Sequence, residues 1–271
     1  QKNNQNGEQF TMNIFFKSIL ISTLWMVGAN TVADDHASDS NPAVAMQVHY
    51  CSLKEGKDMT SVNKALSTWR KWKKETNYNG WTAELTPMFD IRDNYDFYWL
   101  NFAPFDYMGE VLKEYESTGG PSQKAIDSVA DCKVAIYGSK LKYPLVEEST
   151  LDETNYVSVE FCNRREGVEM QTLLNRHAYF ASLSEAGDAD YLWNVVWPMA
   201  GVPSVANGTD RADFANMLWY TNLGSLMSSL DSEANGDLGV IRREYIQAYA
   251  DCADRNVFNV NIINKPNRPW R

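Results

Sequence analysis

Apolar and polar residues alternate with a period of two in several parts of the chain, as they do in β-strands with one buried face. The segment Ala45–Ser52 carries apolar residues at every second position from Met46 to Tyr50. The segment Tyr156–Asn163 shows the same alternation. Further strands are predicted at Trp81–Phe89, Tyr95–Phe102, Lys133–Leu141, Tyr191–Met199, Phe214–Thr221 and Asn256–Ile263.

A helical period follows each of the first strands of these two series. Apolar residues at spacings of three and four positions form one face of a helix. The first such stripe consists of Met59, Val62, Leu66 and Trp69, and the second of Met170, Leu173, His177 and Phe180. Helices are also predicted at Phe105–Glu116 and Leu223–Glu233, continued after glycine breaks by Ile126–Asp131 and Ile241–Ala250. The predicted order of elements is βαββαβ, twice.

The chain also repeats itself in sequence. The segment Cys51–Met59 has the pattern C-x-x-basic-E-G-x-acidic-M, and Cys162–Met170 repeats it at an offset of 111. At the same offset Pro87-Met88 matches Pro198-Met199, and at an offset of 120 Trp99 matches Trp219 and Asp131-Cys132 matches Asp251-Cys252. Four matches in the same order predict an internal duplication. We place the first βαββαβ repeat at 46–144, a linker at 145–155, the second repeat at 156–266 and a tail at 267–271.

The N-terminal part resembles a targeting segment. Residues 1–11 are interpreted as sequence upstream of the start at Met12. A basic residue, a short apolar run and small residues ending at Ala33 then predict a signal peptide over 12–33. A retained N-terminal anchor is the alternative. The acidic, aperiodic residues 34–45 are predicted to be a flexible tether, and no later apolar stretch is long enough to span a membrane. We therefore expect an exported protein, periplasmic in a bacterium and otherwise secreted.

Charge and composition narrow the function classes. The chain has 35 acidic and 25 basic residues, a net charge of −10, which argues against binding to nucleic-acid phosphates. Apolar residues make up 44%, as in ordinary globular proteins. No glycine-rich phosphate loop, zinc spacing or G-x-S-x-G pattern is present. The sequence therefore contains no catalytic motif.

The four cysteines test the predicted order of elements. An even number of cysteines in an exported chain indicates disulfides, with three connectivities open. The βαββαβ unit is the ferredoxin-like arrangement, in which the last strand lies antiparallel beside the first. This places Cys51 beside Cys132 and Cys162 beside Cys252, so we predict one disulfide in each repeat. A four-cysteine metal site is the alternative, although no histidine accompanies the cysteines.

Two fused ferredoxin-like repeats in an exported chain resemble the dimeric α+β barrel superfamily, with the dimer fused into one polypeptide. The resemblance covers nearly the whole chain after position 33 but rests on element order and duplication. It implies an α+β fold in which two antiparallel sheets face each other as a pseudo-dimeric barrel, with a cavity between sheet and helices. Members include cofactor-free monooxygenases and haem-binding or haem-degrading enzymes. No cofactor is predicted from the residues themselves, and haem enters only as an alternative through this resemblance.

His177 is the candidate for chemistry, because it replaces the apolar Leu66 of the first repeat on a helix face that should be buried. A neutral imidazole in a cavity acts as a base or as a haem ligand. The alternative is a core histidine that only packs. In both interpretations we expect a buried, neutral ring.

Tryptophans are the second group of candidates. Eight of them follow position 33, more than a small core usually contains. They predict either an aromatic cavity for an apolar or planar ligand, or ordinary core and interface packing. The candidate ligand-binding residues are Trp69, Trp81, Trp99, His177, Trp193 and Trp219.

These observations leave three functional hypotheses. The first is a non-enzymatic exported module that binds a small apolar or aromatic ligand or a protein partner. The second is a monooxygenase-like or haem-dependent oxidoreductase that uses His177. The third is a structural, envelope-associated protein.

Overall fold

The structure is a computed structural model of the 271-residue chain. It describes residues 42–89, 95–143, 154–187, 189–202 and 212–266, which belong to one compact unit. The predicted upstream segment, signal peptide and tail lie outside the described residues, as do most of the tether and most of the linker. Among the described helices, none is long and apolar enough to cross a membrane.

The first half of the described chain follows the predicted order. Its elements are β1 (Val44–Leu53), α1 (Met59–Glu75), β2 (Trp81–Phe89), β3 (Phe97–Ala103), α2 (Phe105–Thr118), α3 (Gly120–Asp127) and β4 (Ala130–Tyr143). The prediction for Ile126–Asp131 was wrong at both ends. The helix α3 begins six residues earlier than predicted, because Pro121 suits the first turn of a helix. It ends at Asp127, and Asp131 already pairs with β1.

The second half repeats the order with one addition. Its elements are β5 (Tyr156–Arg164), α5 (Met170–Ala186), β6 (Leu192–Ala200), β7 (Phe214–Tyr220), α6 (Leu223–Asn235), α7 (Asp237–Ala248), β8 (Ala250–Cys252) and β9 (Asn256–Asn264). The helix predicted over Ile241–Ala250 begins earlier, at Asp237, and ends at Ala248. Ala250 belongs to β8, which the pattern did not predict and which pairs with β5.

The repeated Glu-Gly pair marks the turn from the first strand of each half into its helix. Gly56 has a φ of 71° and Gly167 a φ of 78°, a backbone conformation that other residues adopt only with strain. In the first half Asp58 caps the N-terminus of α1, and its carboxylate accepts a hydrogen bond of 2.7 Å from the amide of Ser61. The repeated motif therefore has a backbone role.

The strands form one large antiparallel sheet in a mixed α+β fold. In the first half the strand order is β4-β1-β3-β2, and in the second half β5 pairs with β7, which pairs with β6. The two halves join edge to edge, β2 with β9 and β4 with β6, so that all strands except β8 form a closed ring. The expectation of two sheets that face each other is thus refined, because the two sheets continue into one another and close a barrel.

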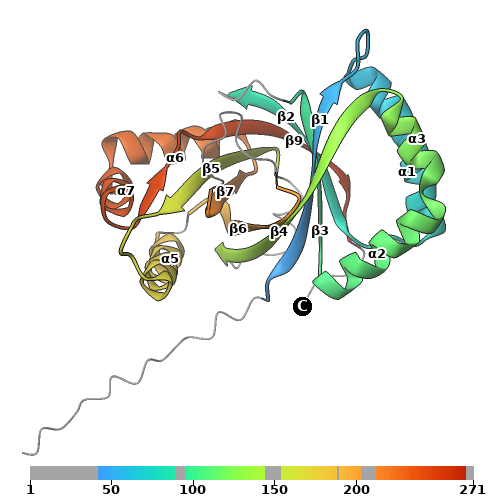
Figure 1. Ribbon diagram of the computed structural model, residues 1–271. Helices are drawn as coiled ribbons and strands as arrows, with labels where there is room; N and C mark the ends of the chain where they lie inside the picture. Colours follow the sequence, from blue (N-terminus) through green and yellow to red (C-terminus); the bar gives the residue numbers. More distant parts are fainter. Residues whose placement is uncertain (1–41, 90–94, 144–153, 188, 203–211, 267–271) are drawn as a thin grey trace, which may run out of the picture. The chain divides into compact units, whose positions relative to one another are not determined.

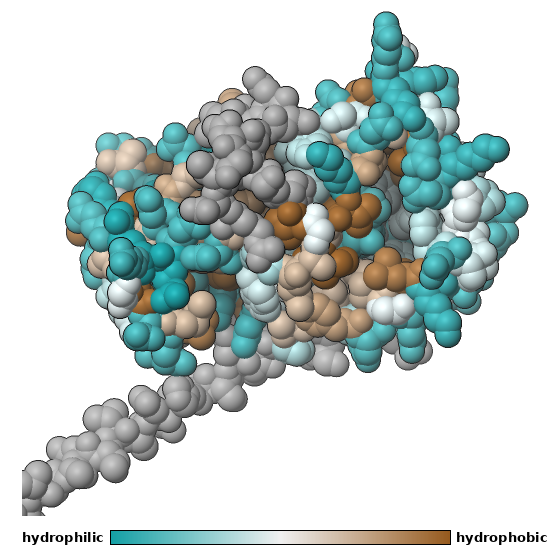
Figure 2. Space-filling model, viewed as in Figure 1, coloured by the Kyte–Doolittle hydropathy of each residue, from teal (hydrophilic) through white to brown (hydrophobic). Residues whose placement is uncertain are grey.

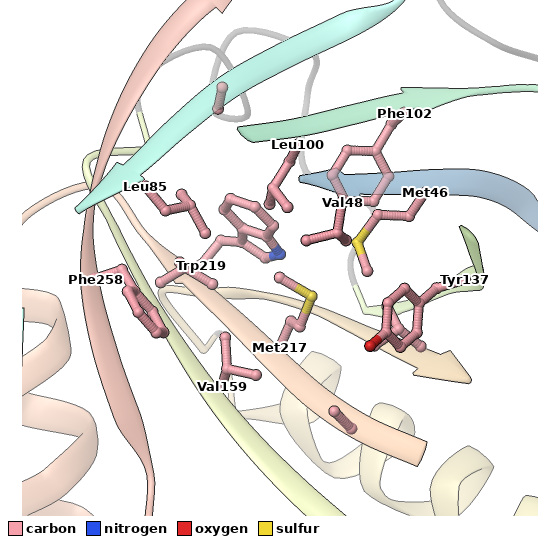
Figure 3. Packing of buried hydrophobic residues seen from close by; sticks show 14 of the residues in the cluster. Met46, Val48, Leu85, Leu100, Phe102, Tyr137, Val159, Met217, Trp219 and Phe258 are labelled. Atoms are coloured by element: carbon pink, nitrogen blue, oxygen red, sulfur yellow. The ribbon is translucent and has the colours of Figure 1, made fainter. Parts of the chain in front are cut away.

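The barrel interior is the main hydrophobic core. Figure 3 shows side chains from both halves, among them Val48, Leu100, Val159 and Met217, pointing toward one another inside the ring of strands. Trp219 packs there too, edge to face against Trp81 with ring centroids 5.5 Å apart. The two halves therefore share one core.

The strand register corrects one predicted equivalence. The pairing of β3 with β1 and of β7 with β5 gives Trp219 the position of Phe102, whereas Trp99 corresponds to Asn216. Trp219 faces the barrel interior and Trp99 faces the helices. The match of Trp99 with Trp219 in the sequence was therefore wrong. The offset between the halves at β3 and β7 is therefore smaller than the 120 positions taken from the match of Trp99 with Trp219.

Helices cover the outer faces of the sheet. Figure 1 shows α1, α2 and α3 on one side of the strands and α5, α6 and α7 on the other. On the face seen in Figure 2, apolar residues gather over the strands, and the outer surfaces of the helices are mostly hydrophilic. Met170, predicted to lie on the buried stripe of α5, is 52% exposed, because it sits in the first turn of α5, at the end of the stripe. Leu173 and His177 on the same stripe are buried as predicted.

Both predicted disulfides are present. Cys51 and Cys132 face each other across β1 and β4, and Cys162 and Cys252 face each other across β5 and β8. The ferredoxin-like strand order brings each pair into direct register. Paired cysteines are compatible with an exported protein, since disulfides persist in oxidising compartments.

Candidate functional site

Each half of the molecule contains a cavity between the outer face of its strands and its helices. The first cavity, between β1, β3 and helices α1 to α3, has a volume of about 210 Å³. The second cavity, between β5 to β7 and helices α5 to α7, has a volume of about 660 Å³. A volume of 300–1,000 Å³ is usual for the binding site of a small molecule or cofactor. The second cavity is therefore the principal candidate site.

Aromatic residues form one wall of the second cavity. Trp193 on β6 and Tyr245 on α7 are 6% and 5% exposed and line it together with Phe180 and Tyr191. The indole Nε1 of Trp193 donates a hydrogen bond of 3.1 Å to Oδ1 of Asn216 on β7. This wall offers flat apolar surface and leaves no unpaired indole donor.

Four charged side chains also line the second cavity. This charge quartet consists of Glu160 on β5, Glu233 on α6, Arg242 on α7 and Arg255 in the turn before β9. Arg242 pairs with Glu160 at 2.5 Å and also with Glu233, and Arg255 pairs with Glu233 at 2.7 Å. The quartet has no net charge, and it ties two helices to the sheet.

Burial and charge act against each other at Arg255. Burial disfavours a charged guanidinium and by itself lowers the pKa of Arg255, but the carboxylates of Glu160 and Glu233 raise the pKa further than burial lowers it. Arg255 is therefore a permanent cation in the wall. Small hydroxyl side chains of α6 complete the polar side of the cavity, namely Ser225, Ser228, Ser229 and Ser232.

His177 lies behind the aromatic wall and does not line the cavity. It is 1% exposed, and its ring packs edge to face against Trp193 and Phe214. Its Nε2 lies 2.8 Å from the hydroxyl oxygen of Tyr245, and its buried Nδ1 has no hydrogen-bond partner among the described residues. The structure thus places His177 in the core of the second half.

The pKa of His177 is lowered to about 3, first by burial and second by the charge of Lys142. The ring is therefore neutral at pH 7, as predicted from its place in the sequence. A base with so low a pKa takes up no proton near neutral pH. Burial also raises the pKa of the Tyr245 phenol well above its ordinary value.

The predicted ligand-binding tryptophans are divided among three environments. Trp69 and Trp99 line the first cavity, and Trp193 lines the second. Trp81 and Trp219 pack in the barrel interior, away from both cavities. The structure therefore does not gather the predicted residues into one site.

The charge quartet is the feature that sequence reasoning missed. Its one local signal is Glu160, an acidic residue in a strand whose neighbours Val159 and Phe161 are apolar. Glu160 is 4% exposed and holds the position of His49 in the first half, since the halves align at an offset of 111 through β1 and β5. The partners on α6, on α7 and before β9 lie more than 70 positions further along the chain, and no spacing connects them with Glu160.

A group of metal-ligand types occurs beside the quartet. Glu160, Cys162 and Cys252 bring their ligand atoms within 4.8 Å of one another. Both sulfur atoms belong to a disulfide, and the carboxylate is paired with Arg242. No thiolate is therefore available to hold a metal ion there.

Comparison with known proteins gives likeness of fold only. No family model matches the sequence, and no curated protein matches it. Among solved structures, a haem-binding protein from Thermus thermophilus has 11% identity and a TM-score of 0.45, covering 82% of this chain and 94% of that one. A chlorite dismutase from Candidatus Nitrospira defluvii in complex with imidazole has 8% identity and a TM-score of 0.47, covering 82% and 91%. An anthrone oxidase-like protein has 10% identity and a TM-score of 0.49, covering 82% and 93%.

The residues present do not fit haem through a histidine. An axial histidine must present a ring nitrogen to the iron. His177 does not line the second cavity, and its Nε2 is engaged with Tyr245. His49 lines only the first cavity, which at about 210 Å³ is smaller than usual cofactor sites. The remaining histidine, His36, lies outside the described residues.

Proposed function

We propose that the protein is an exported binding module that holds a small amphipathic ligand in the second cavity. The observation that carries this proposal is a cavity of about 660 Å³ in one half, at a place where the other half is largely filled. The aromatic wall of Trp193 and Tyr245 suits an apolar or planar body. The serines of α6 and the charge quartet suit a polar end. Because the quartet has no net charge, that end is an uncharged hydrogen-bonding group.

Export and duplication belong to the same proposal. The signal peptide expected over 12–33 and the two disulfides support export. The same strand order, the same cysteine positions and the same Glu-Gly turns in both halves support the duplication of a ferredoxin-like unit into a fused pseudo-dimeric α+β barrel. A duplicated unit supplies two sites of the same origin, and only one of them needs to retain the original packing.

The size of the second cavity has a direct cause in the sequence, and this cause supplies the test. Leu183 on α5 lines the second cavity and holds the position of Trp72 on α1, which fills the first. Leu183→Trp should therefore narrow the second cavity with the residue that the first half already accepts. Tyr179→Trp on the same helix adds an indole at a residue that is 47% exposed and does not line the cavity, and serves as the control.

The experiment compares small molecules released by denaturation from protein purified from its natural host. We expect a compound with an aromatic or apolar body from the wild type and from Tyr179→Trp, at near equimolar amounts, and much less from Leu183→Trp. A visible absorption spectrum of the same samples reports any haem. Equal amounts of compound from Leu183→Trp and the wild type would contradict a site in the second cavity.

A further inference from the structure

His49 stands apart from the other polar residues of the first cavity. It lies on β1 between Trp99 of β3 and Val134 of β4, on the face that is turned toward the helices. Its imidazole lines the cavity and makes no hydrogen bond with any described residue, and no feature of the proposed function uses it. A polar ring in such a place normally has a partner.

Several other polar groups of this cavity are hydrogen-bonded to described residues. Nδ2 of Asn101 donates a hydrogen bond of 3.0 Å to Oε1 of Gln47. Oδ1 of Asn101 accepts a hydrogen bond of 3.2 Å from Nε1 of Trp99. Nε1 of Trp72 donates to the hydroxyl of Thr118 at 2.9 Å. These groups are engaged with other described residues, whereas both ring nitrogens of His49 can still bond to a ligand.

The charge and shape of the first cavity limit which ligands it can hold. The described residues that line the first cavity include no lysine, arginine, aspartate or glutamate, so a charged ligand finds no counter-ion. The walls are the flat faces and edges of Trp69, Trp72, Trp99 and Tyr115. Leu112 and Val134, which also line it, are 39% and 44% exposed, so part of the cavity lining is at the surface. An engineered cavity of about 150 Å³ binds benzene, and the 210 Å³ here hold one aromatic ring with a small substituent.

We propose that the first cavity is a separate binding site for an uncharged single-ring molecule of the phenol class, with the ligand hydroxyl hydrogen-bonded to the imidazole of His49. A neutral imidazole offers one acceptor and one donor nitrogen, and a phenol hydroxyl matches either. Burial lowers the pKa of His49 to about 4, so the ring is in this neutral form at pH 7. The indole walls supply edge-to-face contacts for the ligand ring.

The test compares phenol with toluene, which has the same size but a methyl group in place of the hydroxyl. Dissociation constants are measured by NMR titration at pH 7 on the full, disulfide-bonded chain, as wild type, His49→Leu and His177→Leu. His177→Leu removes a buried histidine that lines neither cavity and is the matched control. Leu183→Trp, which narrows the second cavity, separates this site from the proposed function.

We expect phenol to bind the wild type at least tenfold more tightly than toluene, as one buried hydrogen bond predicts. His49→Leu should remove this preference, and His177→Leu and Leu183→Trp should keep it. If His49→Leu does not fold, the ring ¹⁵N signals of His49 in the wild type decide, because phenol must shift them and toluene must not. The proposal is overturned by equal affinities for phenol and toluene, by a preference that survives His49→Leu, or by phenol binding that Leu183→Trp abolishes.

Discussion

The two cavities occupy corresponding places in the two halves, but their chemistry differs. At three equivalent positions the first cavity has a tryptophan where the second has a smaller side chain. These pairs are Trp69 with Phe180, Trp72 with Leu183, and Trp99 with Asn216. Each replacement leaves space, and together they contribute to the difference between about 660 Å³ in the second half and about 210 Å³ in the first.

Polar side chains at equivalent positions make more contacts with other polar groups in the second half than in the first. His49 of the first half has no hydrogen-bond partner among the described residues, whereas Glu160 at the same place holds Arg242 in an ion pair. Leu66 packs in the first half where His177 bonds to Tyr245 in the second. The barrel interior is mostly apolar in both halves, although Asn194 on β6 holds the position of Ala83 on β2 and accepts a hydrogen bond of 2.6 Å from Nε1 of Trp219. The polar differences between the halves therefore lie mainly on the outer faces of the sheet, where the two cavities are.

Removal of each disulfide tests whether the two disulfides stabilise the protein equally. They close loops of 81 and 90 residues, for which loop entropy predicts a nearly equal contribution of about 4–5 kcal/mol each. We expect Cys51→Ala/Cys132→Ala and Cys162→Ala/Cys252→Ala to lower the free energy of unfolding by similar amounts in urea titrations. A difference above ~2 kcal/mol between the two double variants would show that the halves are not equivalent in stability.

Substitutions of Glu160 and His49 test whether these equivalent polar residues contribute differently to stability. Glu160→Gln leaves Arg242 and Arg255 with one carboxylate in a largely buried place, and we expect a loss of about 3 kcal/mol in the free energy of unfolding. His49→Gln at the equivalent position removes no described hydrogen bond and should cost less than ~1 kcal/mol. Denaturant unfolding of both variants measures the contrast. Equal losses would mean that the quartet contributes no more than an isolated polar residue.

Exchange of the paired residues on α1 and α5 tests the cavity difference. Trp72→Leu removes a buried indole and its bond to Thr118, and we expect a loss of about 2 kcal/mol together with a larger first cavity. Leu183→Trp enters space that already exists and should change stability by less than ~1 kcal/mol. Thermal unfolding gives the stabilities, and a structure of Trp72→Leu gives the cavity volume. A large loss for Leu183→Trp would show that the second cavity is narrower at α5 than described.

The smallest expected effect concerns pH and His177. Its ring has a pKa near 6.5 in the unfolded chain and about 3 in the fold, so the unfolded chain binds more protons between these values. Stability is therefore fully present above pH 6.5 and falls as the pH decreases toward 3. His177→Leu, the residue of the first half, should remove about 1 kcal/mol of the loss between pH 7 and pH 5.5.

The measurement is the free energy of unfolding at pH 7 and pH 5.5 for the wild type and His177→Leu. Tyr245→Phe serves as the companion variant, because it leaves the buried Nε2 of His177 without its partner and should lower stability at both pH values. Identical pH dependence in the wild type and His177→Leu would contradict a lowered pKa for this ring.

Local patterns predicted most of the fold. The alternation from Met46 to Tyr50 placed β1, and Phe105–Glu116 predicted α2 to within two residues of its end. Errors arose where long-range pairing decides the outcome. Asp131 looked like the end of a helix but lies in β4, because a partner strand offers its backbone hydrogen bonds. The candidate site was less predictable, since Trp81 and Trp219 turned out to face the barrel interior.

Periodicity and the repeated Cys51–Met59 motif were sufficient for the order of the elements apart from β8, for the ferredoxin-like strand order and for both disulfides. Each of these depends on neighbours along the chain or on a simple rule of strand adjacency. The closing of the sheet through β2–β9 and β4–β6, the charge quartet and the different sizes of the two cavities required the folded molecule. These features join residues that are far apart in sequence. Their energies depend on distance and burial, and neither quantity is written in the spacing of residue types.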